Sequence, residues 1–209
     1  MRKIDPVKHE QKRRDILAAA AHCFARDGFR GASISSICGQ AKISSGHLYH
    51  YFESKEAIIE AMAEVGLEHA EERFNHLMKN DNPIQGLIEE IGQARNQGCI
   101  KPELYAEMHA RKQLHLDMLA EAGRNPAMAE IVKRHATKIR GMLTTLLQAA
   151  QQRGQIDQSL NAELAATILL GAIEGLGKMS IHAPDYDMKQ ELAMLATLIR
   201  RFLTPGAAD

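Results

Sequence analysis

Apolar residues recur at helical spacing along almost the whole chain. Between Arg13 and Asp27 they follow one face of a helix, at Ile16, Leu17, Ala20, Ala21 and Phe24. Helix-start signals, a capping Ser, Asn or Asp or an early Pro, return near residues 33, 44, 54, 82, 101, 125, 161 and 187. No stretch alternates apolar and polar residues in the way that a strand would. The pattern predicts an all-α protein of about nine helices.

The expected helix lengths divide the chain in two. Three short helices end near residue 53, and longer helices follow. We therefore expect an N-terminal unit at residues 1–53 and a helical bundle with its own core at residues 54–209. The fourth helix, capped by Ser54, is expected to begin beside the first unit and to run into the second.

The charges are distributed unevenly between these parts, although Lys plus Arg (26) and Asp plus Glu (26) balance over the chain. Residues 1–55 carry ten Lys or Arg against five Asp or Glu, and the remainder carries sixteen against twenty-one. This excess of positive charge indicates an anionic partner for the N-terminal part. A solvated basic tail is the alternative for the opening segment, MRKIDPVKHEQKRR.

Several classes of protein lack support in the sequence. The longest apolar run, roughly residues 165–173, is about half of what a membrane span needs, and no signal peptide is visible. Cys23, Cys38 and Cys99 are scattered, which favours reduced thiols in the cytoplasm over disulfides or a metal site. Nucleophile, zinc-binding and phosphate-loop motifs are missing. We therefore expect neither an enzyme nor a bound cofactor.

The segment SSGHLYHYFESK, residues 44–55, gathers three of the nine Phe and Tyr rings of the chain together with two of its ten histidines. Two short helices joined by a tight turn in a basic unit predict a helix–turn–helix, whose second helix enters the major groove of DNA. The i, i+4 spacing of Leu48 and Phe52 predicts that these two pack inward. The alternative, that Tyr49, Tyr51 and Phe52 are all core rings, leaves the polar residues of the segment unexplained.

The run GFRGASISSICGQAKISSGHLYHYFESKEAII resembles the DNA-binding signature of the TetR family of bacterial regulators, in its Gly-Phe connector, its Ser-led helix and its Tyr-x-Tyr-Phe-x-x-Lys ending. The match covers about residues 13–60. The resemblance implies contacts to double-stranded DNA from Ser33, Ser35, Lys42, Ser44, Ser45, Gly46, His47, Tyr49, His50, Tyr51 and Lys55.

Two positions depart from the family pattern. Lys42 stands where the family usually has Gly at the turn, so the conformation of the turn is an open question at this point. Ser35 stands where a longer and often basic residue is common, so one base contact of the family is expected to be absent.

The resemblance also implies a homodimer on a palindromic operator, built by the last two helices. The implied interface residues are Ile168, Ala172, Gly175, Leu192, Leu195 and Ile199. Small residues in the first of these helices, which let another helix approach closely, agree with this. An ordinary core within one chain is the alternative.

A small-molecule effector that releases a repressor from DNA is the third implication. Candidate effector residues are Glu107, His109, Met142 and Glu174. Each has a plainer reading: Glu107 in a solvated ion-pair row, His109 in a structural role, Met142 as core filler, and Glu174 paired with a basic residue across the dimer. A DNA-bound protein that recruits a protein partner and senses no ligand is the alternative function.

Overall fold

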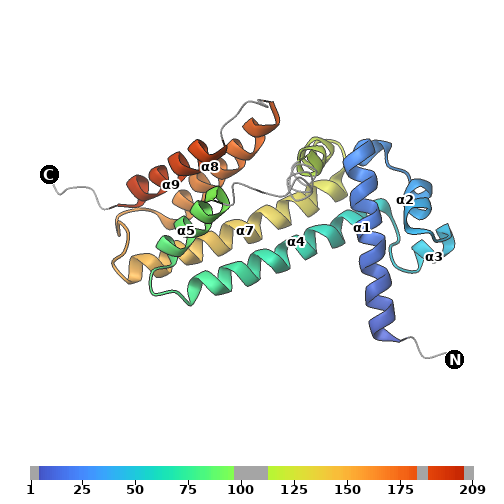
Figure 1. Cartoon of the computed structure of the whole chain (residues 1–209), viewed down its shortest axis with the longest axis horizontal. Helices are drawn as coiled ribbons and strands as arrows, with labels where there is room; N and C mark the ends of the chain where they lie inside the picture. Colours follow the sequence, from blue (N-terminus) through green and yellow to red (C-terminus); the bar gives the residue numbers. More distant parts are fainter. Residues whose placement is uncertain (1–4, 97–112, 183–187, 205–209) are drawn as a thin grey trace. The chain divides into compact units, whose positions relative to one another are not determined.

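The computed structural model describes residues 5–96, 113–182 and 188–204, and within these ranges every regular element is a helix (Figure 1). The helices are α1 (Pro6–Gly31), α2 (Ile34–Ala41), α3 (Ser45–Tyr49), α4 (Lys55–Met78), α5 (Pro83–Asn96), α7 (Pro126–Gln152), α8 (Ala162–His182) and α9 (Met188–Leu203), with a further helix at residues 113–122. The predicted all-α fold is confirmed. The start signals near residues 101 and 187 lie outside the described residues.

Most helices begin where the capping residues predict. The side chains of Ser33, Ser44, Ser54, Asn82, Asn125 and Asn161 each accept a hydrogen bond from a backbone N–H two or three residues further along the chain. These bonds satisfy N–H groups that have no partner within the helix.

Helix α1 begins earlier than its apolar stripe indicates. The Asp5 carboxylate accepts hydrogen bonds from the N–H groups of Val7 and Lys8, and Pro6 occupies the first helical position. At the other end, Gly28 leaves the helical conformation at φ 69° and ψ 171°. The apolar stripe that begins at Arg13 therefore places the start of this helix about two turns late.

Packing divides the chain into two units. One comprises residues 1–66 and 107–134, and the other comprises residues 67–106 and 135–209. Two of the boundaries between these units fall inside α4 and α7, and the third lies outside the described residues. The functional division predicted after residue 53 remains a prediction.

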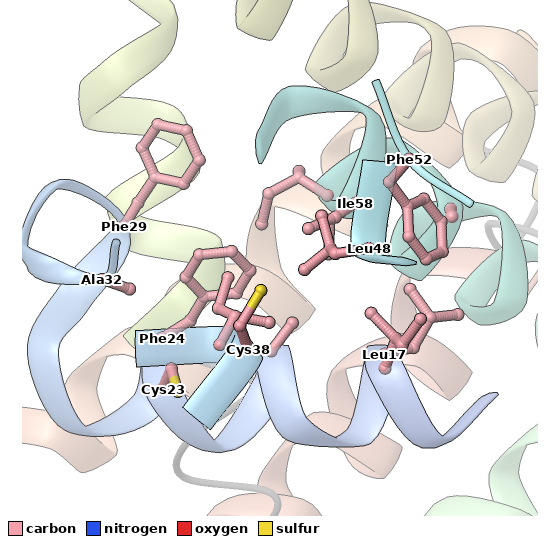
Figure 2. Packing of buried hydrophobic residues seen from close by; sticks show 14 of the residues in the cluster. Leu17, Cys23, Phe24, Phe29, Ala32, Cys38, Leu48, Phe52 and Ile58 are labelled. Atoms are coloured by element: carbon pink, nitrogen blue, oxygen red, sulfur yellow. The ribbon is translucent and has the colours of Figure 1, made fainter. Parts of the chain in front are cut away.

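The core of the first unit is formed by side chains from α1, α2, α3, α4 and the start of α7. Figure 2 shows Leu17, Leu48, Phe52 and Ile58 grouped at one end of this core. Leu48 is 0 % exposed and Phe52 is 4 % exposed, which confirms that both pack inward. Leu48 is the apolar anchor of α3, since the rest of that five-residue helix is exposed.

The second unit has a separate core of its own. In Figure 1, α5, α8 and α9 lie together, and α5 and α9 are in extensive contact. Buried side chains from these helices and from α7 include Ile84, Leu147, Leu169 and Ile199. None of the helices in the described ranges is long and apolar enough to cross a membrane.

We expect the substitution Leu48→Ala to lower the free energy of unfolding by about 2–5 kcal/mol, because it leaves a cavity under α3. The neighbouring substitution Tyr49→Ala is the matched control. It removes a larger but 53 % exposed side chain, so the expected change is less than about 0.5 kcal/mol. Urea unfolding followed by circular dichroism measures both, and an equal loss for the two variants would contradict the assignment of the faces.

Candidate nucleic-acid interface

The α3 outer face consists of the exposed residues Ser44, Ser45, Gly46, His47, Tyr49 and His50. The backbone of this short helix is fixed by the Ser44 cap and by the burial of Leu48. A Cβ added at Gly46 would meet no atom of the chain within 4 Å. The absence of a side chain at Gly46 therefore serves no packing inside the chain, and it leaves the backbone open to a close partner.

Other predicted contact residues surround this face. Ser33, Ser35 and Lys42 are exposed, and Ser33 forms a reciprocal capping box with Ser36 at the start of α2. Serine hydroxyls and helix starts of this kind are common phosphate ligands in DNA-binding proteins. The predicted DNA-contact residues before Tyr51 are thus all accessible.

Lys42 resolves the open question about the turn between α2 and α3. It adopts the left-handed conformation, with φ 53° and ψ 49°, and its N–H caps the end of α2. This is the conformation that glycine supplies at many helix ends. The turn therefore keeps its geometry with a lysine in place of glycine, and the exposed ammonium adds positive charge beside α3.

Tyr51 is half-buried and links two elements. Its ring stacks on the His9 ring of α1, with 4.5 Å between centroids and 28° between the planes. The Tyr51 ring also contacts the His47 ring of α3, with 5.6 Å between the ring centroids. The sequence did not predict the contact with His9, because His9 precedes the recognised motif.

Lys55 has structural contacts that the sequence did not predict. Its Nζ donates to the carbonyl oxygens of Phe29 at 2.6 Å and Ala32 at 3.0 Å, and it lies 4.3 Å from the centre of the Phe29 ring. An ammonium group has three N–H donors, so one remains for a phosphate oxygen. Lys55 thus fixes the start of α4 to the end of α1, and its phosphate contact stays a prediction.

Two acidic residues in the helix at residues 113–122 also bind the end of α1. The Asp117 carboxylate accepts a hydrogen bond from the Phe29 N–H at 3.1 Å. Glu121 Oε2 accepts from Nε of Arg30 and from Nε of Arg124, both at 2.9 Å. Their i, i+4 spacing places the two carboxylates on one helix face, but nothing in the sequence indicates partners nearly ninety residues away.

The pKa of Glu121 is held below its ordinary value of 4.5. The hydrogen bond from Arg30 is the main cause, and Arg124 adds to it, while burial acts in the opposite direction. The Glu121 side chain is 11 % exposed, so the ionised carboxylate depends on these two guanidinium groups.

Only two of the predicted effector residues, Met142 and Glu174, lie among the described residues. Glu107 and His109 lie outside these residues. Met142 is half-buried on α7, and Glu174 is exposed on α8.

The predicted interface residues divide between two faces. Ile168 is exposed, and Ala172, Gly175 and Leu192 are half-buried. Leu195 and Ile199 are instead buried in the core of their own chain, so assigning their side chains to a partner was wrong. The exposed apolar side chains of α8 and α9 are Leu164, Ile168, Met194 and Leu198. In α9 the outer stripe thus lies one residue before the predicted one.

Comparisons of the sequence with protein families agree on one class. Residues 16–62 match the family described as "Bacterial regulatory proteins, tetR family", and residues 103–204 match the C-terminal part of "BetI-type transcriptional repressor". The regulator UidR of Escherichia coli is 31% identical over 190 residues, which cover 90% of this chain and 91% of UidR. The A-factor receptor protein of Streptomyces griseus is 26% identical over 80% of this chain and 54% of its own length.

Solved structures share the fold. The structure of GusR from Salmonella enterica superposes with a TM-score of 0.75 at 27% identity, over 97% of this chain and 99% of that one. Reduced NemR of Escherichia coli superposes with a TM-score of 0.76 at 19% identity, over 94% of this chain and 100% of that one. At 19% identity, the similarity to NemR concerns the fold alone.

The carboxylate of Glu121 gives a prediction for stability against pH. Because its pKa is lowered on folding, its stabilising effect is present above pH 4.5 and is lost as the pH falls through the lowered value. Glu121→Gln should therefore be less stable than wild type at pH 7, and the difference should shrink in acid. Urea unfolding from about pH 7 to about pH 3 measures this difference. The control Glu130→Gln removes an exposed carboxylate and should show no such trend; a pH-independent deficit in Glu121→Gln would contradict the assignment.

Proposed function

Since the chain belongs to the TetR family of bacterial regulatory proteins and is a DNA-binding transcriptional regulator rather than an enzyme, we propose that it is a homodimeric repressor. It binds a palindromic operator in the cytoplasm and leaves the operator when a small molecule binds. The observation that carries this proposal is the α3 outer face, exposed and polar around a single buried anchor, Leu48.

The chemistry of the α3 outer face suits a DNA groove. Tyr49 and His50 offer hydrogen-bonding tips for base edges or phosphates, and Ser44 and Ser45 offer hydroxyls at the helix start. Lys42 supplies positive charge beside this face, and Lys55 carries a further positive charge at the start of α4. Charge of this kind provides affinity for any duplex, and the groups that reach base edges provide the sequence preference.

The exposed apolar side chains of α8 and α9 support the homodimer. Ile168 is 56 % exposed and Met194 is 68 % exposed in the isolated chain. Leu164 and Ile168 lie four residues apart on α8, and Met194 and Leu198 lie four apart on α9, so each pair shares a helix face. Burial of these faces against a second copy removes apolar surface from water. Two-fold symmetry then presents two α3 helices to a palindrome.

The contacts of Asp117 and Glu121 support release by a ligand. Both residues belong to the region that matches the family's C-terminal part, and both bind the end of α1 in the DNA-binding part. A ligand that shifts their helix would move α1, and α2 and α3 with it. Glu107, His109, Met142 and Glu174 remain the proposed effector residues, and a sequence relative named as a receptor agrees with ligand sensing.

DNA binding is tested with a labelled duplex from the intergenic region upstream of the gene. We expect wild type to bind, and Tyr49→Ala to bind about tenfold more weakly or worse, because each protomer loses a contact in the groove. Lys138→Ala, which removes an exposed side chain of α7, is the control and should bind like wild type. The proposal fails if wild type binds no duplex at low salt, or if Tyr49→Ala retains full affinity in a gel-shift titration.

The dimer is tested by charge insertion on α8. Ile168→Glu should yield monomers in sedimentation velocity, because the dimer would bury two carboxylates in an apolar interface. Val7→Glu places the same charge on another exposed apolar residue, on α1, and should leave the dimer intact. A dimeric Ile168→Glu, or a monomeric wild type, would exclude this interface.

A further inference from the structure

The first turns of α1 are built as a helix although they bury no apolar side chain. Val7 is 78 % exposed, and Ile16 is the first core residue of the helix. The Asp5 cap and Pro6 fix the start of this segment. The basic residues of the N-terminal segment from Lys8 onward are therefore carried on a helix instead of a solvated tail.

The ring contacts join this part of α1 to the recognition helix. His9 stacks on Tyr51, and Tyr51 contacts His47, which belongs to the α3 outer face. A row of three rings thus runs from α1 to α3 (Figure 1 shows the two helices). Any partner that covers His47 lies close to the side of α1 that carries His9.

Helical geometry places one lysine on that side. At about 100° per residue, Lys12 and Arg13 flank His9 in opposite directions around the helix. Arg13 is directed to α4, because it lies over the Phe52 ring and 4.0 Å from Glu64. Lys12 therefore lies on the side of His9 away from α4.

The charge of Lys12 is not neutralised within the described part of the chain, where no ion pair involves it. Its neighbour Arg14 differs, since its Nε lies 3.2 Å from Glu10 Oε1 on another face of the same helix. Lys8 lies one turn before Lys12, and its Nζ is 3.8 Å from Asp5 in an exposed pair. A lysine without an ion pair, on the side of α1 that His9 joins to α3 through Tyr51, suits a backbone phosphate.

We propose that the first turns of α1 form a second DNA contact, in which Lys12 binds a backbone phosphate flanking the groove that α3 enters. The stack of His9 on Tyr51 positions Lys12 for this contact. The inference rests on the proposed DNA binding and extends it to residues that precede the helix–turn–helix. It assigns His9 as a positioning residue and Lys12 as a phosphate ligand.

The test is the dependence of DNA affinity on salt, measured by fluorescence anisotropy on the upstream duplex. In Lys12→Gln each protomer loses one phosphate contact. The plot of log K against log salt should therefore become less steep, its slope falling in magnitude by about 1 for each protomer. Arg14→Gln removes the same charge from another face of the helix and should keep the wild-type slope. If wild type binds and Lys12→Gln has the wild-type slope, this inference is overturned while DNA binding stands; if wild type does not bind, DNA binding itself fails.

A second pair of variants tests the role of the stack. His9→Phe keeps a ring against Tyr51, and His9→Ala removes it. We expect His9→Phe to keep the wild-type slope. His9→Ala should show the same less steep dependence on salt as Lys12→Gln. Equal slopes for the two His9 variants would overturn the positioning role.

Discussion

The backbone of Phe29 is held from two sides, and the arrangement of the first unit depends on this. The Lys55 ammonium donates to the Phe29 carbonyl oxygen, and the Asp117 carboxylate accepts from the Phe29 N–H. Both bonds lie at the point where Gly28 breaks the helical conformation. A broken helix leaves peptide groups that need other partners, since an unpaired buried N–H or C=O is costly. A Cβ on Gly28 would lie 2.9 Å from Asp117 Oδ2, so the glycine also admits the carboxylate. One residue thereby joins α1, the start of α4 and the helix at residues 113–122.

The position of α3 depends on α1, and the end of α1 is bound by the helix at residues 113–122. The α3 outer face is positioned by Leu48 and Phe52, which pack against α1, and α1 is held at Phe29 and Arg30. The carboxylates of Asp117 and Glu121 make these latter contacts through hydrogen bonds and not through close packing. The packing core, by contrast, resists shifts because its side chains are closely fitted. The first unit thus combines an apolar core with polar contacts at the end of α1.

Local patterns were sufficient to predict the fold and the face of α3 that packs inward. Capping residues and the stripe of Ile16 to Phe24 report on the chain within a few residues, which is the range over which sequence determines helix boundaries. The start of α1 was missed, because the apolar stripe of this helix begins well after the start signals at Asp5 and Pro6. Leu195 and Ile199 were predicted at an interface although they pack in the core of their own chain, because α9 carries two apolar stripes and the sequence does not indicate which of them faces that core. The contacts of Lys55, Asp117 and Glu121 join residues far apart in the chain, and spacing rules cannot predict them.

The central claim is that two copies of the α3 outer face read a symmetric DNA site. Selection of bound duplexes from a random library tests it most directly, because it requires no knowledge of the operator. The expected result is enrichment of inverted repeats whose half-sites lie about one helical turn apart, about 10 base pairs between centres. Enrichment of single or directly repeated sites, or no enrichment above a non-binding control, would contradict the claim.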